Sequence, residues 1–204
     1  MPSAADPLPL ALPAERPPDL RLLGLPTGTR LWRIDAEPPE TWSWDGFREP
    51  RHRFDPTEGA FRTRYASTRF YGAARERYLD TGRYIPAAHA DHHVVELVAT
   101  QPFRVLDLRN EVKLDLLGLD DRISTSHEPA VWDVAHRLAE RARQWWDRID
   151  GIVYRARTTP SSTSNIAFWS TDGCTSSSRR LGDCAEELDD LVLRRDFTVD
   201  FDWD

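Results

Sequence analysis

The chain has 204 residues, 40% hydrophobic and 30% charged, so it is long enough to bury the core of one compact domain. Its net charge of −7 argues against non-specific binding to nucleic acid or to an anionic membrane, because both would repel it at long range. Two cysteines do not make a disulfide framework, and no stretch approaches the ~20 apolar residues of a membrane span. We therefore expect a cytoplasmic protein.

Residues 1–20 are rich in proline and alanine, which predicts an extended or disordered lead-in. They lack the basic segment of a signal peptide. Residues 21–204 are expected to form a single domain without internal repeats.

The first expected element is a strand at Leu31-Trp32-Arg33-Ile34, a short apolar run between Gly28 and Pro38. A helix is predicted next, with Ser67 or Thr68 as its cap and its end near Tyr78. Two strands follow at residues 94–99 and 103–108, separated by Gln101-Pro102.

The clearest helix is predicted from a cap at Ser126 to about Ile149, because apolar or small residues recur there in steps of three and four. Strands at residues 152–157 and 165–169 flank a loop rich in serine and threonine. A second loop holds Cys174 and residues 176–178, and a short helix covers 184–193. Residues 197–204 alternate apolar and polar, which predicts a final strand. The pattern indicates an α+β fold, a single mixed sheet with packed helices.

Four residues form a candidate anion-binding site with a carboxylate. Arg33 lies on the first strand, Arg53 in the loop after it, Tyr65 just before a helix and Glu76 within that helix. They would converge if the helix packs across the strand ends, where binding sites are common. Apolar neighbours of Glu76 suggest a partly buried helix face, where a carboxylate needs a partner or a function.

The order and spacing of six short motifs resemble the RES domain family, named for an arginine, a glutamate and a serine. The similarity covers about residues 28–170. The motifs are the strand with Arg33, Arg53-Phe54-Asp55-Pro56, Arg64-Tyr65-Ala66-Ser67, Ala73-Ala74-Arg75-Glu76, Gly151-Ile152-Val153-Tyr154 and Asn165-Ile166-Ala167-Phe168.

The resemblance implies a fold similar to ADP-ribosyltransferases and the activity of a bacterial toxin that destroys NAD. Such an enzyme cleaves the nicotinamide–ribose bond with water or phosphate as acceptor, which the sequence leaves open. It implies catalytic roles for Arg33, Tyr65 and Glu76, and substrate binding by Arg53 and Tyr154. NAD is then a substrate, and no permanently bound cofactor is expected. The family also implies a partner antitoxin of the helix-turn-helix type, and a homodimer stays open.

The family's serine is expected two residues after Tyr154, where this chain has Ala156. Either Ser161 or Ser162 supplies the hydroxyl, or the contact is weakened, or turnover is lost. The alternatives to an NAD-degrading enzyme are therefore a nucleotide-binding or interaction protein without activity, and an enzyme that transfers ADP-ribose to a macromolecule.

Two further patterns were considered as functional sites and do not match known motifs. His89, His92 and His93 with the two cysteines do not have the spacing of a zinc module, so no metal site is expected. The loop at residues 158–164 lacks the Gly-x-Ser-x-Gly motif of a serine hydrolase.

Overall fold

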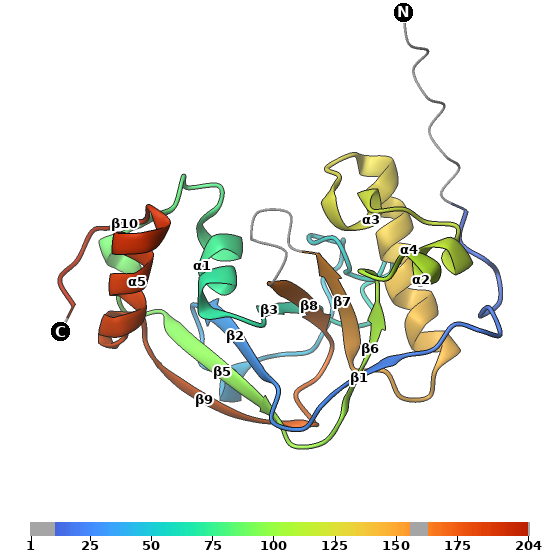
Figure 1. Cartoon of the computed structure of the whole chain (residues 1–204), viewed down its shortest axis with the longest axis horizontal. Coiled ribbons are helices and arrows are strands. Elements are labelled where there is room, and N and C mark those ends of the chain that lie inside the picture. Colours follow the sequence, from blue (N-terminus) through green and yellow to red (C-terminus); the bar gives the residue numbers. More distant parts are fainter. Residues whose placement is uncertain (1–10, 156–162, 204) are drawn as a thin grey trace, which may run out of the picture.

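A curved sheet of eight strands forms the centre of the computed structural model, which describes residues 11–155 and 163–203 (Figure 1). The strand order is β1-β6-β7-β8-β3-β2-β5-β9, in which β6 and β7 are parallel and the other neighbours antiparallel. The strands are β1 (Leu23–Leu25), β2 (Arg30–Asp35), β3 (Arg64–Ser67), β5 (His93–Ala99), β6 (Phe103–Asp107), β7 (Gly151–Arg155), β8 (Ser164–Phe168) and β9 (Cys174–Arg180). A separate parallel pair joins β4 (Tyr84–Ile85) to β10 (Thr198–Val199).

Two groups of helices cover the same face of this sheet. The helices α2 (Glu111–Leu117), α3 (Arg122–Thr125) and α4 (Pro129–Trp145) lie over β6, β7 and β8, whereas α1 (Phe70–Tyr78) and α5 (Ala185–Arg195) lie over β2 and β5 (Figure 1). Each group buries its own hydrophobic cluster against the sheet. A third cluster on the opposite face contains Trp42 and Phe168. The predicted α+β fold with one large mixed sheet is confirmed.

The alternation of side chains along the strands explains how one sheet supplies three clusters. On β7, Ile152 and Tyr154 belong to the cluster under α4, and Val153 between them belongs to the cluster on the opposite face. Successive side chains of a strand point to opposite faces, so a continuous apolar run marks a strand buried on both sides. All three of these residues are buried.

The long helix is shorter than predicted. It begins at Pro129, with Glu128 as the residue before the first turn, and the Ser126 hydroxyl instead accepts a bond from the Glu128 amide (3.0 Å). Proline favours the first helical position and disfavours helix at the residue before it, which explains this start. The helix ends at Trp145 because Trp146 is extended. The predicted apolar stripe is present, since Val131, Ala135, Leu138 and Ala142 are buried.

The predicted cap of α1 was also wrong. Arg69 precedes the helix without a side-chain bond, and the Thr68 hydroxyl accepts a bond from the Ser164 amide (3.2 Å). The predicted strand at residues 197–204 pairs only at Thr198 and Val199. The alternation there places Phe197, Val199, Phe201 and Trp203 against the core cluster under α5, without a long ladder.

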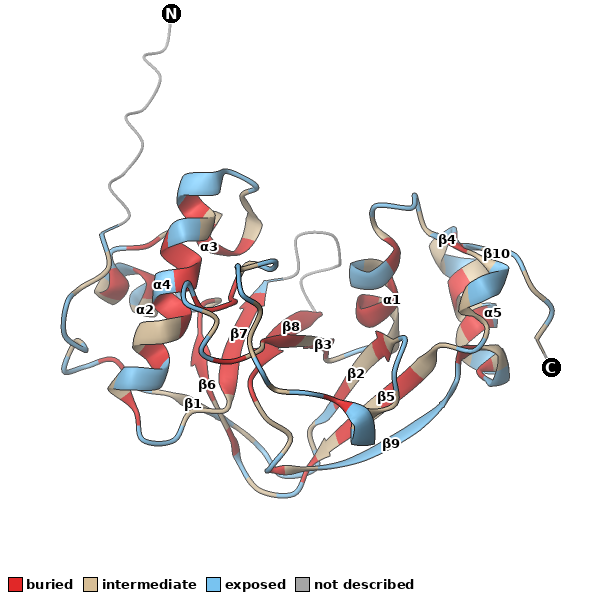
Figure 2. Ribbon diagram, turned by 180° about the vertical axis from the view of Figure 1, so that it is seen from behind, coloured by how far each residue is buried: buried red, intermediate tan, exposed pale blue. Residues whose placement is uncertain are grey.

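Further features of the structure were not expected from the sequence. The loop predicted around Cys174 is β9, a strand that the pattern missed because six of its seven residues are exposed at the sheet edge (Figure 2). The strands β5 and β6 follow each other in the sequence but do not pair. Packing also begins before Arg21, because Leu20 is fully buried and Arg141 donates to the carbonyl of Leu12 (2.8 Å).

Candidate active site

A pocket of about 370 Å³ opens between the two helical groups, on the face of the sheet that they cover. It is lined by α1, by the ends of β2, β3 and β7, by the loop before β3, and by residues of α3 and α4. All five predicted site residues that the structure describes line it, namely Arg33, Arg53, Tyr65, Glu76 and Tyr154. Residues from β2, the loop before β3, β3, α1 and β7 therefore meet in one cavity.

Arg33 is held by two hydrogen bonds to the protein. Its Nε donates to Asp35 Oδ2 (2.7 Å) and its Nη1 donates to the Tyr65 carbonyl (2.9 Å). The side chain is 23% exposed. Because Arg33 and Asp35 are two residues apart on β2, their side chains lie on the same face.

Asp35 also bonds Arg64, whose Nη1 donates to the same Oδ2 (3.0 Å). Burial alone would raise the pKa of Asp35, but the charges of Arg33 and Arg64 and the hydrogen bond from Arg33 outweigh it and lower this pKa. Burial, with the nearby charge of Arg33, lowers the pKa of Arg64 to about 10, so this guanidinium stays charged at neutral pH. The sequence analysis did not single out Asp35, although its spacing from Arg33 was a usable signal.

Tyr65 presents a fixed phenol to the pocket. Its hydroxyl accepts a hydrogen bond from the Phe54 amide (2.9 Å). The turn carrying Phe54 is held by Thr63, whose hydroxyl donates to the Phe54 carbonyl (2.6 Å), and by Asp55, which accepts from the His52 amide (2.8 Å). Burial, with Tyr154 and Asp55 nearby, raises the pKa of Tyr65 well above its usual value. The phenol therefore keeps its proton and can donate it in a hydrogen bond.

Tyr154 lies beside Tyr65, with ring centroids 6.4 Å apart in an edge-to-face arrangement. Burial and the charge of Glu76 raise the pKa of Tyr154. The Asn165 side chain on β8 lies near the Tyr154 hydroxyl without the geometry of a hydrogen bond. Tyr154 and Tyr65 thus form a neutral aromatic side of the pocket.

Glu76 was expected on a partly buried helix face, and this expectation was wrong. The residue is exposed, whereas Ala73, Ala74 and Tyr78 of the same helix are buried. Helix α1 turns these small and aromatic residues toward the sheet and leaves Glu76 on the side that lines the pocket. The carboxylate is therefore accessible to a ligand.

Arg53 connects the loop before β3 to the helical group of α2, α3 and α4. Its Nη1 donates to the Ile123 carbonyl (3.2 Å), and its guanidinium carbon lies 5.4 Å from the centre of the Trp132 ring. Trp132, His127 and Ser124 line this side of the pocket. The sequence analysis missed them, because no local motif connects α3 and α4 to residues 70 positions earlier.

The loop after β7 was expected to supply a further hydroxyl to the site. Ala156, Ser161 and Ser162 lie outside the described residues. Another hydroxyl lines the pocket, that of Ser124, which is 4% exposed and whose Oγ has no hydrogen-bond partner within the described part of the chain.

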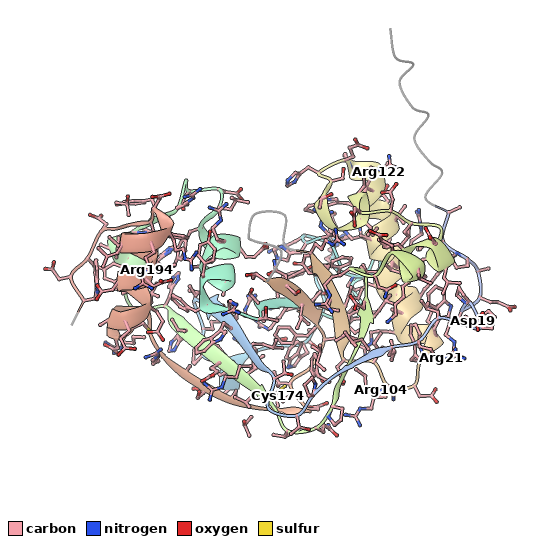
Figure 3. All side chains as sticks on the ribbon, in the orientation of Figure 1. Asp19, Arg21, Arg104, Arg122, Cys174 and Arg194 are labelled. Carbon is pink, nitrogen blue, oxygen red and sulfur yellow. The ribbon has the colours of Figure 1, made fainter. Side chains whose placement is uncertain are left out.

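The histidines and cysteines considered as a metal set do not line the pocket. Cys174 lies at the sheet edge far from the helices (Figure 3), and Cys184 is buried before α5. Within residues 11–155 and 163–203 no group of three or more histidine, cysteine or acidic side chains is arranged to hold a metal ion. The rings of His89 and His92 stack with centroids 3.9 Å apart. Burial, with the charges of His89 and Arg77, lowers the pKa of His92 to about 4.

None of the helices that the structure describes is both long and apolar enough to cross a membrane.

Comparison with known proteins adds three findings. The model of the RES domain family matches residues 30–191, well over half of the chain. The fold is similar to the crystal structure of the M. tuberculosis MbcT-MbcA toxin–antitoxin complex, with a TM-score of 0.53 and 15% sequence identity over 77% of this chain and 87% of that one. No curated protein matches the sequence.

Proposed function

Because the chain belongs to the RES domain family, we propose that it cleaves the bond between nicotinamide and ribose in NAD. The observation that carries the proposal is the convergence of two arginines, two tyrosines and a glutamate in one pocket. These groups match the substrate, which has an anionic pyrophosphate, an aromatic ring and a bond whose cleavage leaves positive charge on the sugar.

The arginines suit the pyrophosphate. Guanidinium groups form charge-assisted hydrogen bonds with phosphate oxygens, and these are stronger than neutral ones. Arg33 and Arg53 come from different elements of the pocket wall, β2 and the loop that bonds Ile123, so both can contribute to binding the substrate. Tyr65 and Tyr154 offer ring edges and faces against which a nicotinamide can pack.

Glu76 suits the sugar. When the bond between the ribose carbon and the nicotinamide nitrogen breaks, its electron pair neutralises the pyridinium, and the ribose becomes an oxocarbenium-like cation. A nearby carboxylate stabilises that cation, as in glycoside cleavage. Water then adds to the same carbon with loss of a proton, or phosphate adds through an oxygen.

The test is to incubate the purified protein with NAD and to measure free nicotinamide. Sustained release that is lost in Glu76→Ala supports the proposal. Glu186→Ala is the matched control, because Glu186 is an exposed helical glutamate outside this pocket. Nucleotide binding without release would favour an inactive binding protein, the alternative that Ala156 at the expected serine position supports. Mass spectrometry of added proteins would reveal transfer of ADP-ribose.

We also propose that the chain is the toxin of a toxin–antitoxin pair and acts in the cytoplasm. The support is the RES family match and the fold shared with a protein solved as a toxin–antitoxin complex. A partner with a helix-turn-helix domain, encoded beside this chain, should copurify with it and suppress nicotinamide release. Release that is unaffected by the neighbouring gene product would contradict this role.

A further inference from the structure

The pocket opens where the central sheet separates between β2 and β3. These strands pair only at Trp32 and Ser67, whereas β2 pairs with β5 along its whole length. Continuing the register from Trp32 and Ser67 would place Ile34 opposite Tyr65. That pairing is absent, and the Arg33 side chain donates to the Tyr65 carbonyl instead.

One carboxylate holds this guanidinium in place. Asp35 Oδ2 accepts from Arg33 Nε (2.7 Å) on β2 and from Arg64 Nη1 (3.0 Å) on β3, so it bridges the two separated strands. Arg64 is well anchored, since its side chain is 6% exposed and its guanidinium carbon lies 4.4 Å from the centre of the Trp42 ring. Arg33 is therefore connected through Asp35 to a group that is itself packed in the protein.

The cluster of Arg33, Asp35 and Arg64 offers a ligand net positive charge and one hydrogen-bond donor. Two guanidinium groups share one carboxylate, so the cluster is cationic overall. Within the described residues Arg33 uses Nε and Nη1 for bonds to the protein, and Nη2 has none. The third nitrogen is therefore the one available to an anion in the pocket.

We propose that Asp35 is a positioning residue, which holds Arg33 between β2 and β3 so that its Nη2 donates to a phosphate of the bound dinucleotide. This rests on the function proposed above. If Asp35 positions Arg33, removing its carboxylate should weaken anion binding. If it only offset positive charge, removing it would strengthen anion binding by Coulomb attraction. The sign of the change on removing Asp35 therefore separates the two roles.

The test compares wild type with Asp35→Asn by titration with ADP-ribose, which retains the pyrophosphate of NAD. We expect the Kd to rise about tenfold in Asp35→Asn, although the variant is less negative. Asp35→Glu keeps the charge and moves the carboxylate by one methylene, and we expect its Kd to rise several-fold. Asp196→Asn removes the carboxylate of the exposed pair with Arg83 and is the matched control. An unchanged or lower Kd in either Asp35 variant would overturn the proposal.

A second measurement does not depend on the substrate. In nitrogen-15 NMR spectra, the Nε–H of Arg33, identified by its loss in Arg33→Lys, should exchange slowly with water in wild type and rapidly in Asp35→Asn. Slow exchange that persists without Asp35 would contradict the positioning role. If wild type neither binds ADP-ribose nor releases nicotinamide, the proposed function fails, while the NMR result and a titration with inorganic pyrophosphate still decide the role of Asp35.

Discussion

Replacing Arg33 by lysine keeps the charge of the pocket but removes the planar set of hydrogen-bond donors that the guanidinium provides. Arg33 makes two bonds to the protein, at 2.7 Å to Asp35 and at 2.9 Å to the Tyr65 carbonyl, and a third nitrogen remains for a ligand. Lysine has one nitrogen on a flexible chain and cannot reproduce this fork. A single ammonium cannot hold both protein contacts and also reach a phosphate from the same position.

The expected loss follows from the bonds removed. A hydrogen bond to a charged group contributes about 1.5–3 kcal/mol, and about 1.4 kcal/mol corresponds to a factor of ten. If Arg33→Lys loses one such bond in the transition state, kcat/KM for nicotinamide release should fall roughly 10- to 100-fold. The net charge is unchanged, so long-range attraction of the anionic substrate is preserved.

The assay measures initial rates of nicotinamide release over a range of NAD concentrations. Arg30→Lys is the matched control on the same strand, because Arg30 is 67% exposed and contacts Glu96 at 3.3 Å outside the pocket. It should retain the wild-type rate. A kcat/KM within twofold of wild type in Arg33→Lys would show that charge alone matters at this position and would refute the reasoning.

Three further predictions concern stability. Gly72→Ala should lower the midpoint of thermal unfolding, because a Cβ there would lie 2.0 Å from Ser67 Oγ and overpacking typically costs about 1–3 kcal/mol. Gly24→Ala is the control and should leave the midpoint unchanged, because a Cβ at Gly24 has no atom within 4 Å. The free energy of unfolding should fall as the pH drops from about 6.5 to about 4, since the unfolded chain binds a proton at His92 that the folded chain does not. Urea titrations of His92→Gln should show a weaker pH dependence over this range. A pH dependence equal to that of wild type would disprove this explanation. Ser124→Ala should leave the midpoint unchanged or raised, because the buried hydroxyl has no partner within the described residues; a clear drop would reveal one.

Local patterns predicted α1, α4 and α5 and the strands β2, β5, β6, β7 and β8, but they missed the short helices α2 and α3 and the strands β1, β3, β4 and β9. The apolar stripe from Val131 to Ala142 identified α4, because a helix with one buried face repeats every three to four residues. Strand β9 was missed because its exposed residues carry no such pattern, and its pairing with β5 alone makes it a strand. The starts of α1 and α4 differed from the prediction, because the hydroxyls of Thr68 and Ser126 accept bonds from other amides and Pro129 sets the first turn of α4.

Part of the candidate site was likewise predictable from the sequence, and part depended on the tertiary structure. The residue types and their order pointed to Arg33, Arg53, Tyr65, Glu76 and Tyr154, and all five line one pocket. The side of the pocket formed by Ser124, His127 and Trp132 could not be predicted from the sequence. These residues lie far along the chain from Arg33 and Arg53, and only the tertiary fold brings them together. The exposure of Glu76 was misjudged for a related reason, since the partners on each face of a short helix depend on the tertiary structure.

By itself, the amino-acid sequence determined the chemistry available to this protein: guanidinium groups, phenols and a carboxylate on short strands and helices of an α+β fold. The tertiary structure alone decided that β2 and β3 separate beyond Trp32 and that Asp35 bridges Arg33 and Arg64 across the gap. Helix and strand periodicity is a property of neighbouring residues, whereas the separation of two strands depends on how all the layers pack at once.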